Sequence, residues 1–397
     1  GWQATDFIQL TQYNRDIEPF SQLWLTASDT SVMLDSWMNG PFRDLDAENM
    51  AKQLTSWWKA LHKLVKSFKN SPEIVDVTTT FKERIDNFKL HLPLIAGMRN
   101  SGMRDRHWNR LEEEIGMAVK PDANTTLVEL LNKELGQHIA VIEEVSAVAS
   151  KEFSLESALD KMMNEWRSIN FDAVAYRSTG CYVLRGTDEV MAVLDDQIVT
   201  TQAMRGSPFI KPFEVRIKGW EKTLATLQEL MDEWLAFQRV WMYLEPIFSS
   251  EDIMRQLPNE GRMFNVMNAR WMKIMELTNE KKNVLAIYEY DENLLSNFQE
   301  ANRVMDEIQK KLNDYLETKR SAFPRFYFLS NDELLEILSQ VRDPLAVQPH
   351  LSKCFEGIYR LTFDSNKEII AMSSIEEEKV NFLNKVSPVG NVEDWLL

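Results

Sequence analysis

Apolar residues recur every three or four positions over most of this chain, which is the pattern of helices with one buried face. One such run begins after Asp46, continues through Trp57 and Trp58, and closes at Asn70-Ser71-Pro72. The stretch from 20 to 38 stops in a similar way at Asn39-Gly40-Pro41, a helix stop followed by a turn. The pattern therefore predicts long helices joined by short turns.

The same spacing predicts further helices along the chain. A capped start at Thr187-Asp188-Glu189 precedes one of them, and cations at Lys319-Arg320 suit the C-terminus of another. The predicted segments are 73–97, 126–148, 155–169, 190–199, 213–245, 251–257, 260–278, 292–320 and 331–340.

The longest predicted helix follows Pro212 and is expected to end at Pro246, because proline disturbs a helix interior. Its large apolar residues include Trp220, Trp234 and Trp241, all on one stripe. A helix over 213–245 would be about 50 Å long, which suits a rod better than a compact globule. We interpret the stripe as core rather than as a ligand-binding aromatic box, and a stiff core of this kind can transmit displacement.

Two regions depart from the helical pattern. Segment 171–184 holds two short β-favouring runs separated by Arg177-Ser-Thr-Gly180, which predicts a β-hairpin. Leu361-Thr-Phe-Asp and the run 368–372 predict a second small hairpin. With no fixed repeat period, the expected fold is mostly α, an elongated stack of helical bundles with a β-hairpin insertion near 171–184.

No linker rich in Pro, Gly or Ser divides the sequence, so we expect one continuous elongated unit. Its approximate subdomains are predicted at 1–110, 111–212, 213–320 and 321–397. Thirteen Gly and thirteen Pro in 397 residues are few, and twelve Trp are many. These numbers favour long helices pinned together by large rings.

Charge and cysteine content narrow the function classes. The formal charge of -16 and a pI near 5.0 oppose non-specific binding to nucleic acid or to anionic lipid. Cys181 and Cys354 form no CxxC pair and suit a reducing compartment, where we expect both to be buried packing thiols. No 18-residue apolar stretch or signal sequence is evident, so a cytoplasmic protein is expected, and the start at Gly1 suggests a cut within a longer one.

Motifs for nucleotide binding are missing from the sequence. A phosphate-binding loop needs Gly-Lys-Ser/Thr, and the chain contains no Gly-Lys pair. No GxGxxG follows a predicted strand either. We therefore expect no catalytic residue and no cofactor site in this chain.

Metal binding is not expected either. The five histidines show no HExxH spacing and are interpreted as surface or packing residues. Asp195-Asp196 is similar to an aspartate-rich magnesium motif of helical prenyl-chain enzymes, but Val199 occupies the third acidic position. An all-helical enzyme with a buried acidic site therefore stays only as a disfavoured alternative. The histidines are His62, His91, His107, His138 and His350.

Three stretches resemble the linker of dynein heavy chains, most closely those of the axonemal type. The run from Trp234 to Phe248 is similar to the family's WxxxQxxWxYLExIF block. Residues 319–338 resemble its KRxxFPRFYFLSxxxLLEIL segment, which is the most specific match. The runs QPHLSKCFEGI at 348–358 and VEDWL at 392–396 are similar to the next segments along the chain in axonemal members.

The resemblance covers essentially the whole chain and implies its function. In that family the linker connects the tail to the first module of an AAA+ ring, bends near its middle during the ATP cycle, and straightens in the power stroke. ATP and magnesium would be bound by that ring, whose first Walker motif is expected beyond Leu397. The resemblance implies residence in the cytoskeleton of the axoneme, in cilia and flagella.

The resemblance also implies partners. The main one is the AAA+ ring of the same heavy chain, with dynein intermediate and light chains and docking proteins as further candidates. Contact with the microtubule would be only indirect, and neither nucleic acid nor membrane is expected as a partner.

Two groups of residues are singled out as candidate sites. The hinge hypothesis rests on the length of the central helix and on the Gly and Pro residues that flank it. The second group, Phe323-Pro324-Arg325-Phe326, is interpreted as anchoring a helix end near the ring rather than as contacting the ring directly. The hinge candidates are Arg205, Gly206, Pro208, Trp220, Trp234, Trp241 and Pro246.

A passive helical scaffold that tethers partner helices and never bends is the main alternative function. A spectrin-like repeat would require recurrence at a fixed spacing, which the sequence lacks. The next hundred residues of the parent sequence would decide the class, if a Walker motif appears there and five more AAA+ modules follow it.

Overall fold

The computed structural model describes residues 8–341 and 343–397 and divides into two compact units. Unit 1 comprises residues 1–160 and 204–215, and unit 2 comprises residues 161–203 and 216–397. The chain passes between the units inside three helices, α7 (Ile139–Glu165), α8 (Asp188–Arg205) and α9 (Glu214–Phe248). The four subdomains expected from the sequence do not follow these boundaries, since 111–212 contains residues of both units, and they stay a prediction.

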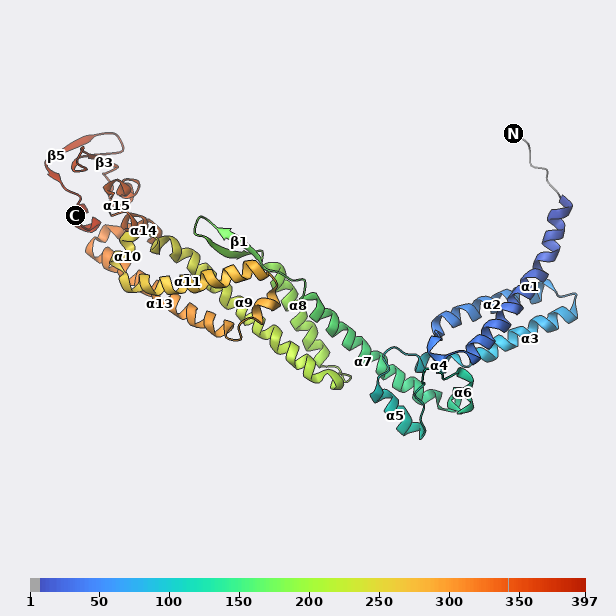
Figure 1. The fold of residues 1–397 in the computed structure, drawn as a ribbon. Coiled ribbons are helices and arrows are strands. Elements are labelled where there is room, and N and C mark those ends of the chain that lie inside the picture. The colour runs from blue at the N-terminus through green and yellow to red at the C-terminus, as the bar shows by residue number, and fades with distance from the viewer. Residues whose placement is uncertain (1–7, 342) are drawn as a thin grey trace. The chain divides into compact units, whose positions relative to one another are not determined.

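Unit 1 is helical over most of its described length (Figure 1). The predicted helix after Asp46 is confirmed, and the Asp46 carboxylate accepts hydrogen bonds from the backbone N–H groups of Glu48 and Asn49. The helices are α1 (Ile8–Asn39), α2 (Ala47–Ser67), α3 (Pro72–Lys89), α4 (Leu92–Met98), α5 (Asp105–Ile115), α6 (Leu127–Asn132) and the first part of α7, with short 3-10 turns η1 (Phe42–Asp44), η2 (Leu135–His138) and η3 (Lys211–Phe213).

The core of unit 1 lies where α1, α2 and α3 meet. The ring of Trp37 lies 5.8 Å from that of Trp57 and 5.5 Å from that of Phe88, measured between centroids. Leu54 and Ile85 are fully buried beside them. Helix α1 contributes its buried residues to this core from Leu23 onward.

Unit 2 combines long helices with two small antiparallel sheets. The predicted hairpin is confirmed as β1 (Asp172–Tyr176) and β2 (Cys181–Arg185), paired in register from Asp172–Arg185 to Tyr176–Cys181. The other elements are α10 (Glu251–Gln256), α11 (Pro258–Lys281), α12 (Val284–Tyr288), α13 (Leu294–Ala322), η4 (Pro324–Phe328), α14 (Asn331–Ser339), η5 (Pro344–His350), α15 (Leu351–Cys354), β3 (Arg360–Phe363), β4 (Ile369–Ser373), β5 (Lys379–Val386) and α16 (Val392–Leu396).

The structure corrects several sequence-based boundaries. The predicted helix 73–97 is two helices, α3 and α4. The predicted helices 126–148 and 155–169 are instead the short α6, the turn η2 and the continuous helix α7. Pro246 does not end the long helix, which continues to Phe248. The predicted helix 190–199 is longer and runs from Asp188 to Arg205. The second hairpin, β3 and β4, is confirmed, but β5 extends it to a three-stranded sheet.

Helix α9 tolerates Pro246 because the carbonyl of Met242, which receives no hydrogen bond from residue 246, accepts one from another group. A residue without a backbone N–H at position 246 cannot bond the carbonyl of Met242, four residues earlier. The hydroxyl of Tyr176 donates to that carbonyl over 3.4 Å. The hairpin thus replaces the missing helical bond.

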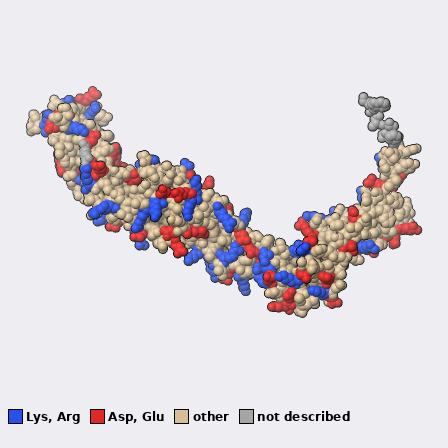
Figure 2. All heavy atoms as spheres, in the orientation of Figure 1, with Lys and Arg blue, Asp and Glu red and all other residues tan. Residues whose placement is uncertain are grey.

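Surface charges of both signs are intermingled on the face that Figure 2 shows, in each unit. That face therefore presents no extended patch of one charge to a partner. Among the described residues, no helix combines the length and apolar character that a membrane span requires.

Candidate functional site around the long helix α9

Helix α9 carries a buried stripe along almost its whole length of 35 residues. At 1.5 Å per residue the helix is about 52 Å long. Trp234 is fully buried and Trp241 is 1% exposed. The other buried residues of the stripe include Ile217, Trp220, Leu224, Leu227, Leu230, Phe237, Gln238 and Leu244.

The centre of the stripe is a cluster of aromatic rings from three helices of unit 2 and from Phe171, the residue before β1. Trp234 stacks on Phe298 of α13 at 4.8 Å and lies 5.4 Å from Phe171, next to β1. Trp241 lies 5.7 Å from Trp271 of α11. Large rings packed from several sides resist displacement, because each would have to leave a close-fitting pocket.

A polar bond inside this core ties α9 to the hairpin. The side-chain amide of Gln238 donates to the carbonyl of Leu184 over 2.9 Å, and its oxygen accepts from the N–H of Leu184 over 2.7 Å. Gln238 is 8% exposed and Leu184 is 5% exposed. A single glutamine therefore satisfies both outward-facing backbone groups of a strand residue.

Asn283 makes a second polar clamp, between α12 and the segment that precedes β1. Its side-chain amide donates to the carbonyls of Trp166, Arg167 and Ile169 over 2.9 to 3.1 Å. Its oxygen caps α12 by accepting from the N–H of Ala286. Sequence reasoning identified neither Gln238 nor Asn283 as a clamp, because a single amide inside a helical pattern carries no signal of its partners.

The hinge candidates fall into two groups, one in each unit. Arg205 is the last residue of α8, and Gly206 and Pro208 lie between α8 and η3, all within unit 1. The other candidates lie within the α9 part of unit 2, where Trp220 contacts Trp166 at 6.5 Å. The boundaries at Ala203/Met204 and Val215/Arg216 bracket the first group.

The family motif at 323–326 begins as α13 ends. As predicted from Pro324, the helix stops at Ala322 and Phe323 caps it. Phe323 and Phe326 are buried with their rings 4.9 Å apart. The Arg325 guanidinium donates to the carbonyl of Cys354 over 3.0 Å and lies 5.0 Å from the ring of Phe355.

A buried ion pair joins α16 to the same helix. The Lys319 ammonium of α13 contacts the Glu393 carboxylate of α16, and their side chains are 12% and 6% exposed. The nearby hydroxyl of Tyr315 donates to the Gln256 side chain, and burial raises the pKa of Tyr315, with the charge of Glu393 adding to the effect. The last described helix is therefore held by charge as well as by packing.

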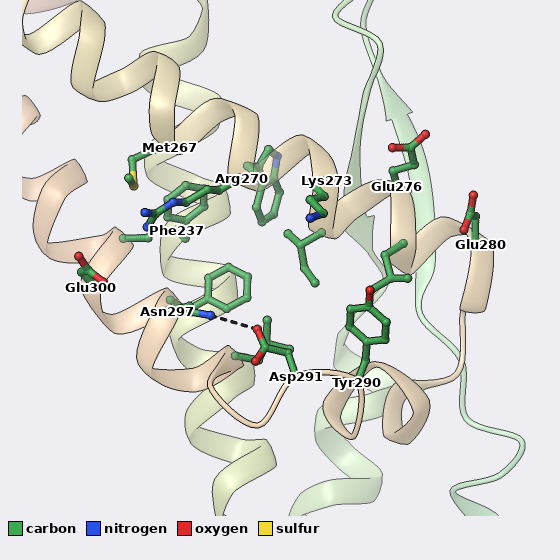
Figure 3. A pocket seen from close by; sticks show the side chains of 16 residues that line it. Phe237, Met267, Arg270, Lys273, Glu276, Glu280, Tyr290, Asp291, Asn297 and Glu300 are labelled. Atoms are coloured by element: carbon green, nitrogen blue, oxygen red, sulfur yellow. Dashed lines mark hydrogen bonds between the residues drawn. The ribbon is translucent and has the colours of Figure 1, made fainter.

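A groove of about 660 Å³ lies between α11 and α13, beside the aromatic cluster. Buried Phe237 and Phe298 lie at it, and Arg270, Lys273 and Glu300 carry charges of both signs. Figure 3 shows Asn297 directed at Asp291, to which it donates over 3.1 Å. Three further carboxylates line it, Glu276, Glu280 and Asp291, so acidic side chains outnumber basic ones and the groove does not favour an anion.

The remaining candidate chemistry matches a packing role. Cys181 and Cys354 are buried as expected, and burial raises the pKa of each thiol to about 11, so both stay protonated near neutral pH. Asp195 of α8 accepts a hydrogen bond from Gln228 over 3.2 Å. Within the two described ranges, no group of three or more His, Cys, Asp or Glu side chains is arranged to hold a metal ion.

Comparison with known proteins identifies the family to which this chain belongs. The family described as "Dynein heavy chain, N-terminal region 2" matches residues 10–397. Dynein axonemal heavy chain 1 of Mus musculus is 48% identical over 397 residues, all of this chain and 9% of that protein. Dynein axonemal heavy chain 3 of Homo sapiens is 44% identical over 381 residues, 95% of this chain and 9% of that protein.

Dynein axonemal heavy chain 12 of Rattus norvegicus is 43% identical over 407 aligned positions, which cover this whole chain and 13% of that protein. The chain thus spans about a tenth of the length of the curated relatives it matches. The resemblance indicated by the sequence motifs is confirmed: the chain belongs to the dynein heavy chain family, as part of its N-terminal region.

Proposed function

We propose that this chain is the mechanical linker of an axonemal dynein, which connects the tail of the heavy chain to its AAA+ ring and bends and straightens during the ATP cycle. Family membership supports the proposal, as do three relatives that are named axonemal heavy chains. On this proposal the chain works in the axoneme of cilia and flagella. The ring would bind ATP and magnesium and hydrolyse the nucleotide, and this chain would be catalytically silent.

The observation that carries the proposal is the clamped helix α9. A helix about 52 Å long bends easily unless its neighbours hold it. Here the Trp234 and Trp241 rings pack against α11, α13 and the hairpin, and Gln238 bonds the hairpin within the core. A load applied at one end of α9 would therefore be carried by unit 2 as a whole.

Bending is proposed at the segment from Arg205 to Pro208, together with the start of α9. The unit boundaries at Ala203/Met204 and Val215/Arg216 support this position. Trp220, Trp234, Trp241 and Pro246 would then stiffen the arm on one side of the bend, because they lie inside unit 2.

The motif at 323–326 is proposed to anchor the end of α13, near the ring. The burial of Phe323 and Phe326 supports anchoring over direct contact with another module. The exposed side chains of Tyr327 and Phe328, at 58% and 69%, follow immediately and are available to a partner. The ring of the same heavy chain would be that partner, with accessory chains and docking proteins as further ones and the microtubule reached only indirectly.

A distance measurement in the complete heavy chain tests the proposal. One fluorophore is placed in unit 1, at exposed Lys52, and another in unit 2, at exposed Lys311, in the otherwise unmodified motor. The distance between them should alternate between two values as ATP is bound and as products are released. A third label at Glu280, paired with Lys311, should report a constant distance because both lie in unit 2.

A constant distance between the two units in every nucleotide state would contradict the proposal. It would favour instead the passive helical scaffold. A change within unit 2 would contradict the proposed stiffness of α9 while leaving the linker function itself intact.

A further inference from the structure

The exposed side of α2 carries a row of lysines in a part of the sequence that holds no acidic residue. Between Glu48 and Glu73 the chain contains neither Asp nor Glu, although the whole chain has 61 acidic and 45 basic residues. The lysines follow one another after four, three and three residues, and all are exposed. The α2 lysine row consists of Lys59, Lys63, Lys66 and Lys69.

The α2 lysine row lies on the side of the helix that faces away from the core of unit 1. Leu54, Leu61 and Leu64 of α2 are buried in that core, at 0%, 0% and 3% exposure. Lys59 and Leu61 point in nearly opposite directions, because two residues turn a helix by about 200°. The row therefore plays no part in the packing of unit 1 and faces solvent.

The row has no acidic partner in the part of the chain that the structure describes. No carboxylate of residues 8–341 or 343–397 forms an ion pair with one of its four lysines. Asp86 of α3 reaches α2, but its carboxylate contacts the Lys89 ammonium at 3.0 Å and accepts from the Trp58 indole over 3.0 Å. Four positive charges thus remain available to another molecule.

The stability of α2 does not account for the row. A cation in the last turn of a helix interacts favourably with the helix dipole, which explains Lys66. Lys59 lies two turns before the end of α2, where this effect has faded, and it repels Lys63 four residues later. A negatively charged partner along the row would remove this repulsion.

Helix α3 adds a positioned cation beside the row. The ammonium of Lys82 lies 4.5 Å from the centre of the Trp58 ring, and His62 stacks on the same ring at 5.1 Å. A cation held over an aromatic ring loses less freedom when it binds an anion, because its position is already restricted. The basic surface therefore joins two packed helices.

We propose that the α2 lysine row binds a short acidic segment of a separate protein. From Lys59 to Lys69 the row is about 15 Å long, the length of about ten residues of helix or five of extended chain. Charge complementarity favours a partner rich in carboxylates. A nucleic acid or an anionic lipid surface would extend past the row and be repelled by the chain's formal charge of -16, whereas a short segment meets the row alone.

This inference goes beyond the proposed function, because it concerns neither bending nor the ring. Binding at the row and distance changes between the two units are separate measurements, so either can fail without the other.

Chemical cross-linking in the complete heavy chain tests the proposal with a decaglutamate peptide as the probe. A carbodiimide joins carboxylates to amines in contact, and mass spectrometry identifies the linked lysines. Lys59, Lys63 and Lys66 should be linked roughly fivefold more often than Lys310 and Lys311, because several weak surface pairs act together at the row. The preference should disappear at about 1 M salt, where charges are screened within about 3 Å.

Lys310 and Lys311 are matched controls, because they are equally exposed on a long helix but have acidic residues three and four positions away. Lys69 reports on variants of the other three lysines. Substituting Lys59→Gln, Lys63→Gln and Lys66→Gln together should lower its linkage severalfold. Arginine at the same three positions keeps the charge and should preserve the linkage of Lys69, which separates loss of charge from loss of structure.

Equal linkage of Lys59 and Lys310 would overturn the proposal, as would unchanged linkage of Lys69 in the glutamine variant. Acetylation of lysines supplies two further arms. Protection of the row by vesicles of phosphatidylserine and phosphatidylcholine, but not by the peptide, would overturn it in favour of a lipid surface. Protection of the row in the heavy chain without any probe would overturn it in favour of an occupant within the heavy chain itself.

Discussion

Replacing Gln238 by leucine removes the amide that satisfies both outward-facing backbone groups of Leu184. The two hydrogen bonds measure 2.7 and 2.9 Å and lie in a region that water does not reach, since both residues are buried. Leaving a buried donor or acceptor unpaired costs about 1–3 kcal/mol. Leucine adds apolar contacts that recover part of this loss, so Gln238→Leu should lower the free energy of unfolding of unit 2 by about 2–4 kcal/mol.

Two assays report the effect. In thermal unfolding followed by tryptophan fluorescence, the transition of unit 2 should shift down by about 4–16 °C, at roughly 2–4 °C per kcal/mol for a unit of this size. In hydrogen exchange, the amide of Leu184 should lose much of its protection, because its acceptor is gone. Gln228→Leu is the control, since Gln228 lies on the same helix and its bond to Asp195 is exposed.

The reasoning is refuted if Gln238→Leu and Gln228→Leu unfold at the same temperature with Leu184 still protected. That result would mean that the core rearranges to satisfy Leu184 in another way. The stiffness argued for α9 would then not depend on this bond.

Three further predictions concern polar groups. Asn283→Ala should lower the stability of unit 2 by about 2–3 kcal/mol in denaturant titration, because three carbonyls lose a shared donor. Lys319→Met should lower it by about 3–5 kcal/mol by leaving the Glu393 carboxylate buried and unpaired, whereas Lys319→Met with Glu393→Leu should recover most of the loss. Burial holds the pKa of His107 in the folded protein below its usual 6.5. The stability that the neutral imidazole contributes is therefore full above pH 6.5 and is lost as the pH falls through the lower folded pKa. His107→Gln should make the free energy of unfolding of unit 1 less dependent on pH over that range.

Each of these has a result that would contradict it. Asn297→Ala removes an exposed hydrogen bond to Asp291 and should leave the stability of unit 2 almost unchanged. If Asn297→Ala and Asn283→Ala lower that stability equally, the prediction for Asn283 is wrong. Failure of the double substitution to recover stability would show that the ion pair is not the cause in the second. The third is contradicted if the free energy of unfolding of His107→Gln depends on pH as it does in the unmodified protein. The imidazole of His107 lies 3.0 Å from the carboxylate of Glu152, and both residues are buried.

Most of the helical architecture could be predicted because periodic burial leaves a direct trace in the order of residues. The stripe through Trp220, Trp234 and Trp241 indicated one long helix, and the structure confirms it. The hairpin at 171–184 was equally clear, because its β-favouring runs flank a turn ending in Gly180, which has a φ of 74°.

The features that the sequence did not predict correctly share a physical reason. β5 was not predicted because its side chains are exposed or half-buried, so no alternation marks it. Pro246 was expected to end α9 because the hydroxyl that replaces its hydrogen bond comes from Tyr176, 70 positions earlier. Long-range partners of single polar groups, such as Gln238 and Glu393, leave no local pattern, so the clamps emerged only in three dimensions.

The discontinuity of unit 1 has a consequence for how the protein is made. Residues 204–215 belong to unit 1, and within it Phe213 is buried under Arg106 while Phe209 faces the ammonium of Lys151. A ribosome that has released residues 1–160 has therefore not yet supplied the whole of that unit. Residues 161–203, which belong to unit 2, must also emerge before unit 1 can be completed. Until then the surface of unit 1 that Phe213 will cover is exposed and can bind chaperones.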